Sequence, residues 1–192
     1  MSAREKDFKI GSFQGKLLPE DGTSEAKLRN DLYLVGMLCI NFTRTENVNV
    51  RLIGYEIPLG YKGDRLDLLG YDEDHNPYLV ELKKDSTNED LSQIMKQISR
   101  YELQFREIQE AIRDEFRLKF HWPEFEITEQ VKKMILAHRD YYKDKSPNDY
   151  NVVDVYICSF ARLNEIYDAD GNVIILDKRG SKGYVNLKIE NR

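Results

Sequence analysis

The chain has 192 residues, 41% hydrophobic and 33% charged, and its 29 basic and 34 acidic residues give a net charge of -5. This composition supports one folded domain and excludes wholly disordered and histone-like basic proteins. No apolar run approaches the roughly 20 residues of a membrane helix. The charged N-terminal segment and two widely separated cysteines, Cys39 and Cys158, predict a cytoplasmic protein with buried free thiols.

The first part of the chain predicts an arm, a helix and three strands. Residues 1–23 are polar and contain several glycines, which indicates an arm. Apolar residues at helical spacing predict a helix over 25–41. β-Branched and aromatic residues predict strands from Asn47, over 65–71 and over 78–84. Turn-forming residues join the last two strands, so we expect an antiparallel hairpin.

The second part predicts a long helix and several strands. Apolar residues recur every three or four positions over 89–118, as in an amphipathic helix. A tight turn is expected over 168–172. The strands expected around it cover 131–142, 152–160, 173–178 and 184–189.

The order of these elements predicts one α/β domain over 1–192, with a mixed sheet and helices on both faces. Residues 24–105 hold the core motifs, and residues 106–192 supply the remaining core strands and elaborations.

Three polar residues interrupt the apolar pattern of the predicted hairpin. Asp67 lies in its first strand, and Glu81 and Lys83 lie in its second. Because strand side chains alternate, Glu81 and Lys83 point to one face, and pairing places Asp67 opposite Glu81. Adjacent carboxylates repel unless a cation lies between them, and oxygen ligands suit Mg²⁺ or Mn²⁺. The pattern predicts metal-assisted phosphodiester hydrolysis; the alternative is a solvated strand face.

The long predicted helix adds polar residues close behind this hairpin. Gln97 and Tyr101 are four positions apart and share a face, with Arg100, a phosphate-binding type of side chain, beside them. Core packing of Tyr101 and a surface position of Gln97 are the alternatives. Several basic residues cluster in this part of the sequence and could form a phosphate-binding patch. They are Lys62, Arg65, Lys83, Lys84, Lys96 and Arg100.

The order Asp67, Glu81-Leu82-Lys83 and Gln97-x-x-x-Tyr101 resembles the motifs of the PD-(D/E)XK nuclease superfamily. The stretch GDRLDLLGYDEDHNPYLVELKK followed by QIMKQISRY is similar to the nuclease domain of NucS-type mismatch endonucleases and to RecB-like nucleases. The resemblance covers residues 25–105. It implies a restriction-endonuclease-like core, with a central mixed β-sheet flanked by helices, and a metal-dependent DNA nuclease of restriction, repair or defence.

The resemblance also implies a role for each motif residue. Asp67 and Glu81 would hold Mg²⁺ or Mn²⁺ together with the main-chain carbonyl of Leu82, and Lys83 would orient the attacking water. The residues expected to contact the nucleic acid are Gln97, Tyr101, Arg100 and Lys84.

Two further acids are candidates for the same site. A Glu on the first helix often completes the site in such nucleases, which implies Glu25. An acidic residue in a first helical turn is equally well explained by the helix dipole. Glu56 is the second candidate, and an exposed strand position explains it as well.

Two other functions stay open. The chain could be a catalytically silent, nuclease-like module for nucleic-acid binding or assembly, which the acidic composition favours. It could also be a structural subunit whose strand charges are solvated. A retained set of two acids and a lysine favours the enzyme. Because many enzymes that cut both strands pair two sites, a homodimer is expected.

Overall fold

The computed structural model describes residues 24–42, 47–60, 63–83, 89–145, 155–160, 166–167, 173–174 and 184–190. The expected arm over 1–23, the expected turn over 168–172, and Lys62 and Lys84 lie outside the described residues.

The described elements are mostly strands. In chain order they are α1 (Ser24–Val35), β1 (Met37–Asn41), β2 (Asn47–Pro58), β3 (Arg65–Tyr71), β4 (Pro77–Lys83), α2 (Leu91–Phe120), β5 (Lys132–His138), the 3₁₀ helix η2 (Arg139–Tyr142), β6 (Val155–Phe160), β7 (Ile166–Tyr167), β8 (Val173–Ile174) and β9 (Tyr184–Ile189). Among the described helices, none is both long and apolar enough to cross a membrane.

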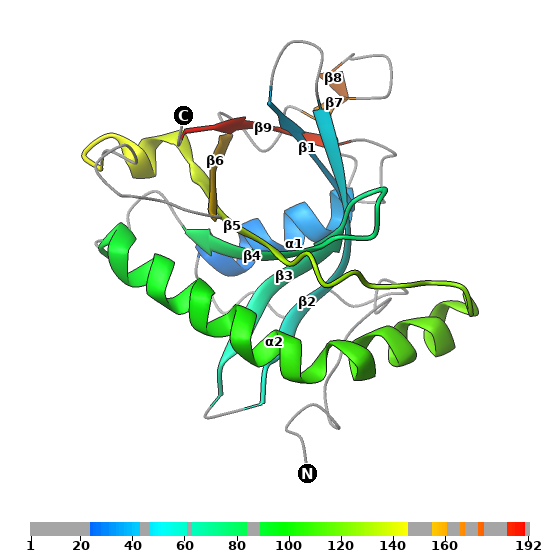
Figure 1. Cartoon of the computed structure of the whole chain (residues 1–192). Coiled ribbons are helices and arrows are strands. Elements are labelled where there is room, and N and C mark those ends of the chain that lie inside the picture. Colours follow the sequence, from blue (N-terminus) through cyan, green and yellow to red (C-terminus); the bar gives the residue numbers. More distant parts are fainter. Residues whose placement is uncertain are drawn as a thin grey trace.

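The sheet closes on itself. Its seven main strands follow the order β1-β2-β3-β4-β5-β6-β9, and β9 pairs antiparallel with β6 and parallel with β1. The pairs β4–β5 and β5–β6 are parallel, whereas β1 to β4 form an antiparallel meander. Figure 1 shows the strands as a ring, with α2 running along its outside.

The expected restriction-endonuclease-like core, an open sheet flanked by helices, is therefore wrong. The structure has a closed, mixed β-barrel of seven strands, and only two α-helices occur in the described part of the chain. The closure depends on the pairing of Leu38 with Val185 and of Ile40 with Leu187. Such contacts between distant segments leave no trace in local periodicity, which is why the pattern of elements predicted an ordinary layered sheet.

The two α-helices pack on opposite sides of the strands. Leu28, Leu32 and Tyr33 of α1 belong to the cluster inside the barrel, together with inward-facing residues of its strands, such as Val80 and Leu82 of β4. Outside the barrel, apolar residues of α2 pack against β3, β4 and β5 in two further clusters. Because β4 is covered on both faces, all of its residues are buried. This coverage determines the environment of its charged side chains.

The helix predicted over 25–41 is only partly correct. It ends at Val35, and its last part is instead strand β1. Gly36 has φ of 78°, a left-handed conformation that glycine adopts readily, and its N–H donates to the Leu32 carbonyl at 3.1 Å. The apolar run after Gly36 then pairs with β2 and β9. A short apolar run fits helix and strand equally well by periodicity.

Most other predicted elements are confirmed within a few residues. The hairpin strands, the long helix and the strand over 184–189 correspond to β3, β4, α2 and β9. The strand expected over 131–142 ends at His138, and the chain then forms the 3₁₀ helix η2. Cys39 and Cys158 are buried free thiols, as predicted.

Candidate functional site

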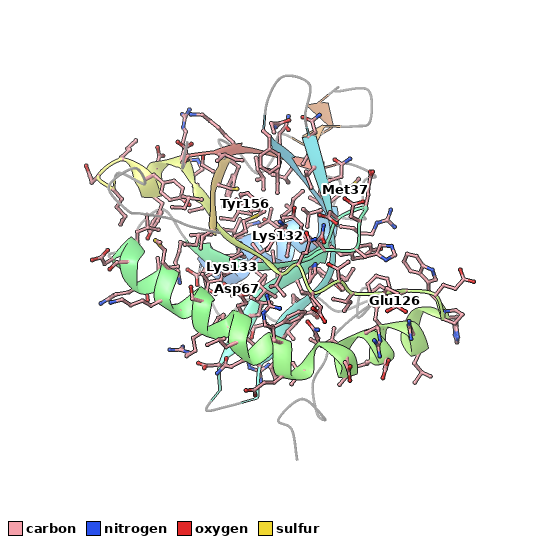
Figure 2. All side chains as sticks on the ribbon, viewed as in Figure 1. Met37, Asp67, Glu126, Lys132, Lys133 and Tyr156 are labelled. Atoms are coloured by element: carbon pink, nitrogen blue, oxygen red, sulfur yellow. The ribbon has the colours of Figure 1, made fainter. Side chains whose placement is uncertain are left out.

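The candidate site begins where β3 and β4 stop pairing. Their ladder runs from Tyr71↔Pro77 to Leu68↔Val80, so Asp67 and Glu81 are the next residues in line. Beyond the last backbone pair, a side-chain hydrogen bond joins the two strands, because Asp67 Oδ2 accepts the Leu82 N–H at 2.8 Å. The hairpin thus carries two acids at its unpaired end. Asp67 lies on the side of the sheet that α2 covers (Figure 2).

Glu81 and Lys83 of β4 are deeply buried charges. Glu81 is 3% exposed and Lys83 is 5% exposed. They alternate with Val80 and Leu82, which face the inside of the barrel, so both charged side chains point outward beneath α2. Charged side chains this deeply buried are rare unless they are paired.

The two carboxylate oxygens of Glu81 have different surroundings. Oε1 accepts hydrogen bonds from Lys83 Nζ at 3.1 Å and from Gln97 Nε2 at 2.9 Å. Oε2 is buried and has no hydrogen-bond partner among the described residues. An unsatisfied buried oxygen on an ionised carboxylate costs free energy, so this atom is poised to accept a donor or a cation.

The electrostatics of the site favour an additional positive charge. Burial and the charge of Glu81 raise the pKa of Asp67 well above its ordinary value. Burial, partly offset by Lys83, raises the pKa of Glu81 to about 7. Although burial opposes it, Glu81 and Glu89 raise the pKa of Lys83. Lys83 is therefore a stable ammonium at neutral pH, whereas Asp67 and Glu81 tend to hold protons, which a bound cation would displace.

Helix α2 brings three of the predicted contact residues to this site. Gln97 Nε2 donates to Tyr101 Oη at 2.8 Å as well as to Glu81, so the amide links the helix to the acid. Tyr101 is 4% exposed. Arg100 lies at the rim, 5.6 Å from the Tyr101 ring centre, and Arg100 Nη2 is 3.2 Å from Asp64 Oδ1. Gln97 and Tyr101 thus border the acids, and Arg100 faces solvent.

The two additional candidate acids have different positions. Glu25, at the start of α1, acts electrostatically on Asp67, Glu81 and Lys83, which places it within range of the cluster. Glu56 instead forms an ion pair with Arg29 of α1, and its Oε2 is 3.9 Å from Arg65 Nε. Its backbone has φ of 50°. The structure therefore brings Glu25 toward the acids and directs Glu56 toward arginines.

The expected basic patch is largely neutralised in its described part. Arg65 lies near Glu56, and Arg100 pairs with Asp64. Lys83 is buried among the acids, whereas Lys96 is exposed.

Sequence reasoning missed Glu89 as a member of the site. Its Oε2 lies 3.0 Å from Lys83 Nζ, and its side chain is 48% exposed. The signal was weak, because an acid just ahead of a long helix is also explained by the helix dipole. The pairing with Lys83 depends on where α2 docks on the barrel.

The acids of the site are of a type that binds divalent cations, but the described side chains do not form a complete set of metal ligands. Two adjacent carboxylates, one with a free oxygen, are ligands that Mg²⁺ and Mn²⁺ prefer. No group of three or more His, Cys, Asp or Glu within the described residues is arranged to hold a metal ion.

The chain matches no protein-family model, no curated protein and no solved structure.

Proposed function

We propose that the protein is a Mg²⁺- or Mn²⁺-dependent nuclease that hydrolyses phosphodiester bonds of DNA. One observation carries this proposal: Glu81 is buried with an unpartnered oxygen, beside Asp67, at the unpaired end of the β3–β4 hairpin. A structural carboxylate would have its oxygens satisfied. The motif order from Asp67 to Tyr101, which resembles that of PD-(D/E)XK nucleases, supports DNA as the substrate.

Asp67, Glu81 and the main-chain carbonyl of Leu82 are the proposed metal ligands. When bound there, the ion would supply Lewis acidity toward a phosphate oxygen and lower the pKa of a bound water. Cation binding would also relieve the repulsion that raises the pKa of Asp67.

The remaining side chains would bind and orient the reactants. Because its pKa is raised, Lys83 stays protonated and cannot act as a base; it donates hydrogen bonds to the attacking water or to a phosphate oxygen. Gln97 holds Glu81 in position through the 2.9 Å bond. In the reaction, the water oxygen bonds to phosphorus, the bond from phosphorus to one sugar oxygen breaks, and that sugar oxygen gains a proton.

A catalytically silent binding or assembly module is the second candidate. The observation in its favour is the double pairing of Lys83 Nζ, at 3.1 Å from Glu81 and 3.0 Å from Glu89. This arrangement partly neutralises the cluster without a metal ion, and it occupies the ammonium that would serve catalysis.

Cleavage of defined nucleic acids separates the two candidates. Linear duplex DNA, supercoiled plasmid, single-stranded DNA and RNA are each incubated with the protein and Mg²⁺, Mn²⁺ or EDTA. Glu81→Ala is compared with Glu107→Ala, which removes an exposed acid of α2. Metal-dependent cutting that is lost only in Glu81→Ala supports the nuclease. No cutting, with no effect of Mn²⁺ on the melting temperature, supports the binding module.

A further inference from the structure

A second polar site lies at the other end of the β3–β4 hairpin. It is a pocket of about 440 Å³, bounded by the start of β1, the first half of β2, the end of β3 with the turn after it, and the segment after α2. Met37, which lines this pocket, lies well apart from Asp67 in Figure 2. The pocket is therefore separate from the acidic cluster.

Three aromatic rings line the pocket. Tyr71, His75 and Trp122 have ring centres between 5.9 and 6.4 Å apart. Trp122 is 37% exposed although it is a large hydrophobic side chain. Exposed aromatic rings beside polar groups are typical of sites that stack planar ligands.

The aromatic wall is preorganised by its backbone. The Trp122 N–H donates to the Arg117 carbonyl at 3.1 Å, and the Trp122 carbonyl accepts the Phe125 N–H at 3.2 Å. The His75 N–H donates to the Asp72 carbonyl at 3.0 Å. The rings of Tyr71 and Trp122 also pack on Phe125, with ring centres 5.1 and 5.2 Å apart, so a ligand that stacks on them loses little affinity to ordering the protein.

Unpaired polar side chains surround the rings. Asn49, Arg51 and Glu73 are exposed, and none of their side chains has a hydrogen bond or ion pair with another described residue. Asp72 also lines the pocket, but its two oxygens accept hydrogen bonds from the turn that follows it. Counting partners among the described residues, the pocket therefore offers an unpaired cation, an unpaired anion and an unpaired amide.

This combination of charges selects among ligand classes. A quaternary ammonium suits the aromatic rings and the acids, but it neither donates nor accepts hydrogen bonds, so it would leave Asn49 and Arg51 without partners. A lone phosphate suits Arg51 but would be repelled by Asp72 and Glu73. A neutral planar group that both donates and accepts hydrogen bonds satisfies all of them, and nucleobases have this chemistry.

We propose that this pocket binds an unpaired nucleobase of a single-stranded nucleic acid, which stacks on Trp122 and hydrogen-bonds to Arg51 and Glu73. The inference does not depend on hydrolysis at the acidic cluster, and it adds a binding site to the proposed nuclease.

Trp122 is the only tryptophan in the chain, so its fluorescence reports on this pocket alone. The full chain, kept in EDTA to prevent metal-dependent cleavage, is titrated with single-stranded DNA pentamers of dA, dC or dT. An abasic pentamer with the same phosphates is the control. We expect the base-bearing pentamers to quench the fluorescence and the abasic pentamer to bind at least about tenfold more weakly.

Binding of labelled pentamers by anisotropy then tests the individual side chains. Trp122→Ala is expected to weaken binding about tenfold, and Arg51→Ala and Glu73→Ala about fivefold each. Arg139→Ala is the matched control, because that arginine is 67% exposed and lies outside the pocket. Arg51 and Glu73 are exposed, so their variants keep the test decisive if Trp122→Ala does not fold.

Three results would overturn the proposal. The first is equal quenching by abasic and base-bearing pentamers, which would indicate phosphate binding. The second is quenching by tetramethylammonium but by no pentamer, which would indicate a site for a methylated cation. The third is no response to any pentamer, or equal affinities of Arg51→Ala, Glu73→Ala and Arg139→Ala. Loss of base binding would leave the cleavage experiment unaffected, so the two proposals fail separately.

Discussion

The two ends of the β3–β4 hairpin each bury a carboxylate, but the two carboxylates differ in how many of their oxygens accept hydrogen bonds. At the turn, Asp72 is 8% exposed, and both of its oxygens accept N–H donors from Asp74 and Asn76 at 2.9 to 3.0 Å. At the unpaired end, Glu81 is 3% exposed, and its Oε2 has no partner in the described part of the chain. Burial of an acid alone therefore does not mark a functional site.

The difference between the ends lies in what satisfies the negative charge. The Asp72 carboxylate is held by donors within four residues of it, so it stabilises its own turn. Glu81 accepts hydrogen bonds at one oxygen only, from Lys83 of its own strand and Gln97 of α2, and Asp67 and Glu81 repel each other. We infer that the turn acid is structural and that the acid of the unpaired end serves a ligand.

The largest expected effect concerns cleavage. Replacing Glu81 or Lys83 with alanine should reduce the rate at least about 100-fold, because each change removes a group that the proposed mechanism places at the reacting phosphate. Gel-based cleavage rates at saturating Mg²⁺ measure this. Glu107→Ala, on the exposed face of α2, should cleave like the wild type. Unchanged cleavage in Glu81→Ala would remove the acidic cluster from the mechanism.

The turn acid should affect stability instead. Asp72→Ala removes three hydrogen bonds in a buried turn and should lower the free energy of unfolding by about 2–4 kcal/mol. Urea unfolding measures the loss. The adjacent, exposed Glu73→Ala should change stability by less than about 0.5 kcal/mol. Equal stability of the two variants would show that the turn does not need its carboxylate.

The acidic cluster should make stability depend on pH when no metal is present. The pKa of Glu81 rises from 4.5 to about 7 on folding, so between these values the native state holds more protons than the unfolded state. Stability must then fall as pH rises through this window, by roughly 2 kcal/mol between about pH 5.5 and 7.

Urea unfolding in EDTA across this range tests that sign. Glu81→Gln cannot lose the proton, so its stability should change less with pH than that of the wild type. A wild-type protein that becomes more stable over the same range would contradict the assignment of a raised pKa to Glu81.

The smallest expected effect is stabilisation by Mn²⁺. At a concentration ten times its Kd, a ligand that binds only the native state adds about 1.4 kcal/mol, which corresponds to a Tm increase of about 3–6 °C. Asp67→Asn should abolish this increase, whereas Asp72→Asn should retain it. A shift of equal size in the wild type and Asp67→Asn would place the ion elsewhere.

Local patterns were enough to predict the parts of the site that lie on single elements. The alternation in β4 correctly placed Val80 and Leu82 inside the core and Glu81 and Lys83 on the other face. The four-residue spacing of Gln97 and Tyr101 correctly predicted a shared helix face, and their side chains are hydrogen-bonded. Both results follow from fixed periods of backbone geometry.

Local sequence patterns did not predict the contacts between different helices and strands. The ion pair of Lys83 with Glu89 and the pairing of Glu56 with Arg29 depend on how α2 and α1 dock. The sequence made Glu56 a candidate acid for the site, but in the structure it forms an ion pair with Arg29 of α1. Side-chain partners across elements depend on packing angles that no local spacing specifies.

By itself, the sequence determined the hairpin, the long helix and the acids placed on them, because hydrophobic period and turn chemistry act over a few residues. Only the tertiary structure decided that residues after Gly36 form β1 and that β9 joins β1 to β6. Closure pairs Asn41 with Lys188, far apart in sequence, and it buries the inward-facing side chains of β1 and β9, such as Leu38 and Leu187, inside the barrel. The docking of α2 on the outer face of β4 buries Glu81 and leaves one of its carboxylate oxygens without a partner among the described residues.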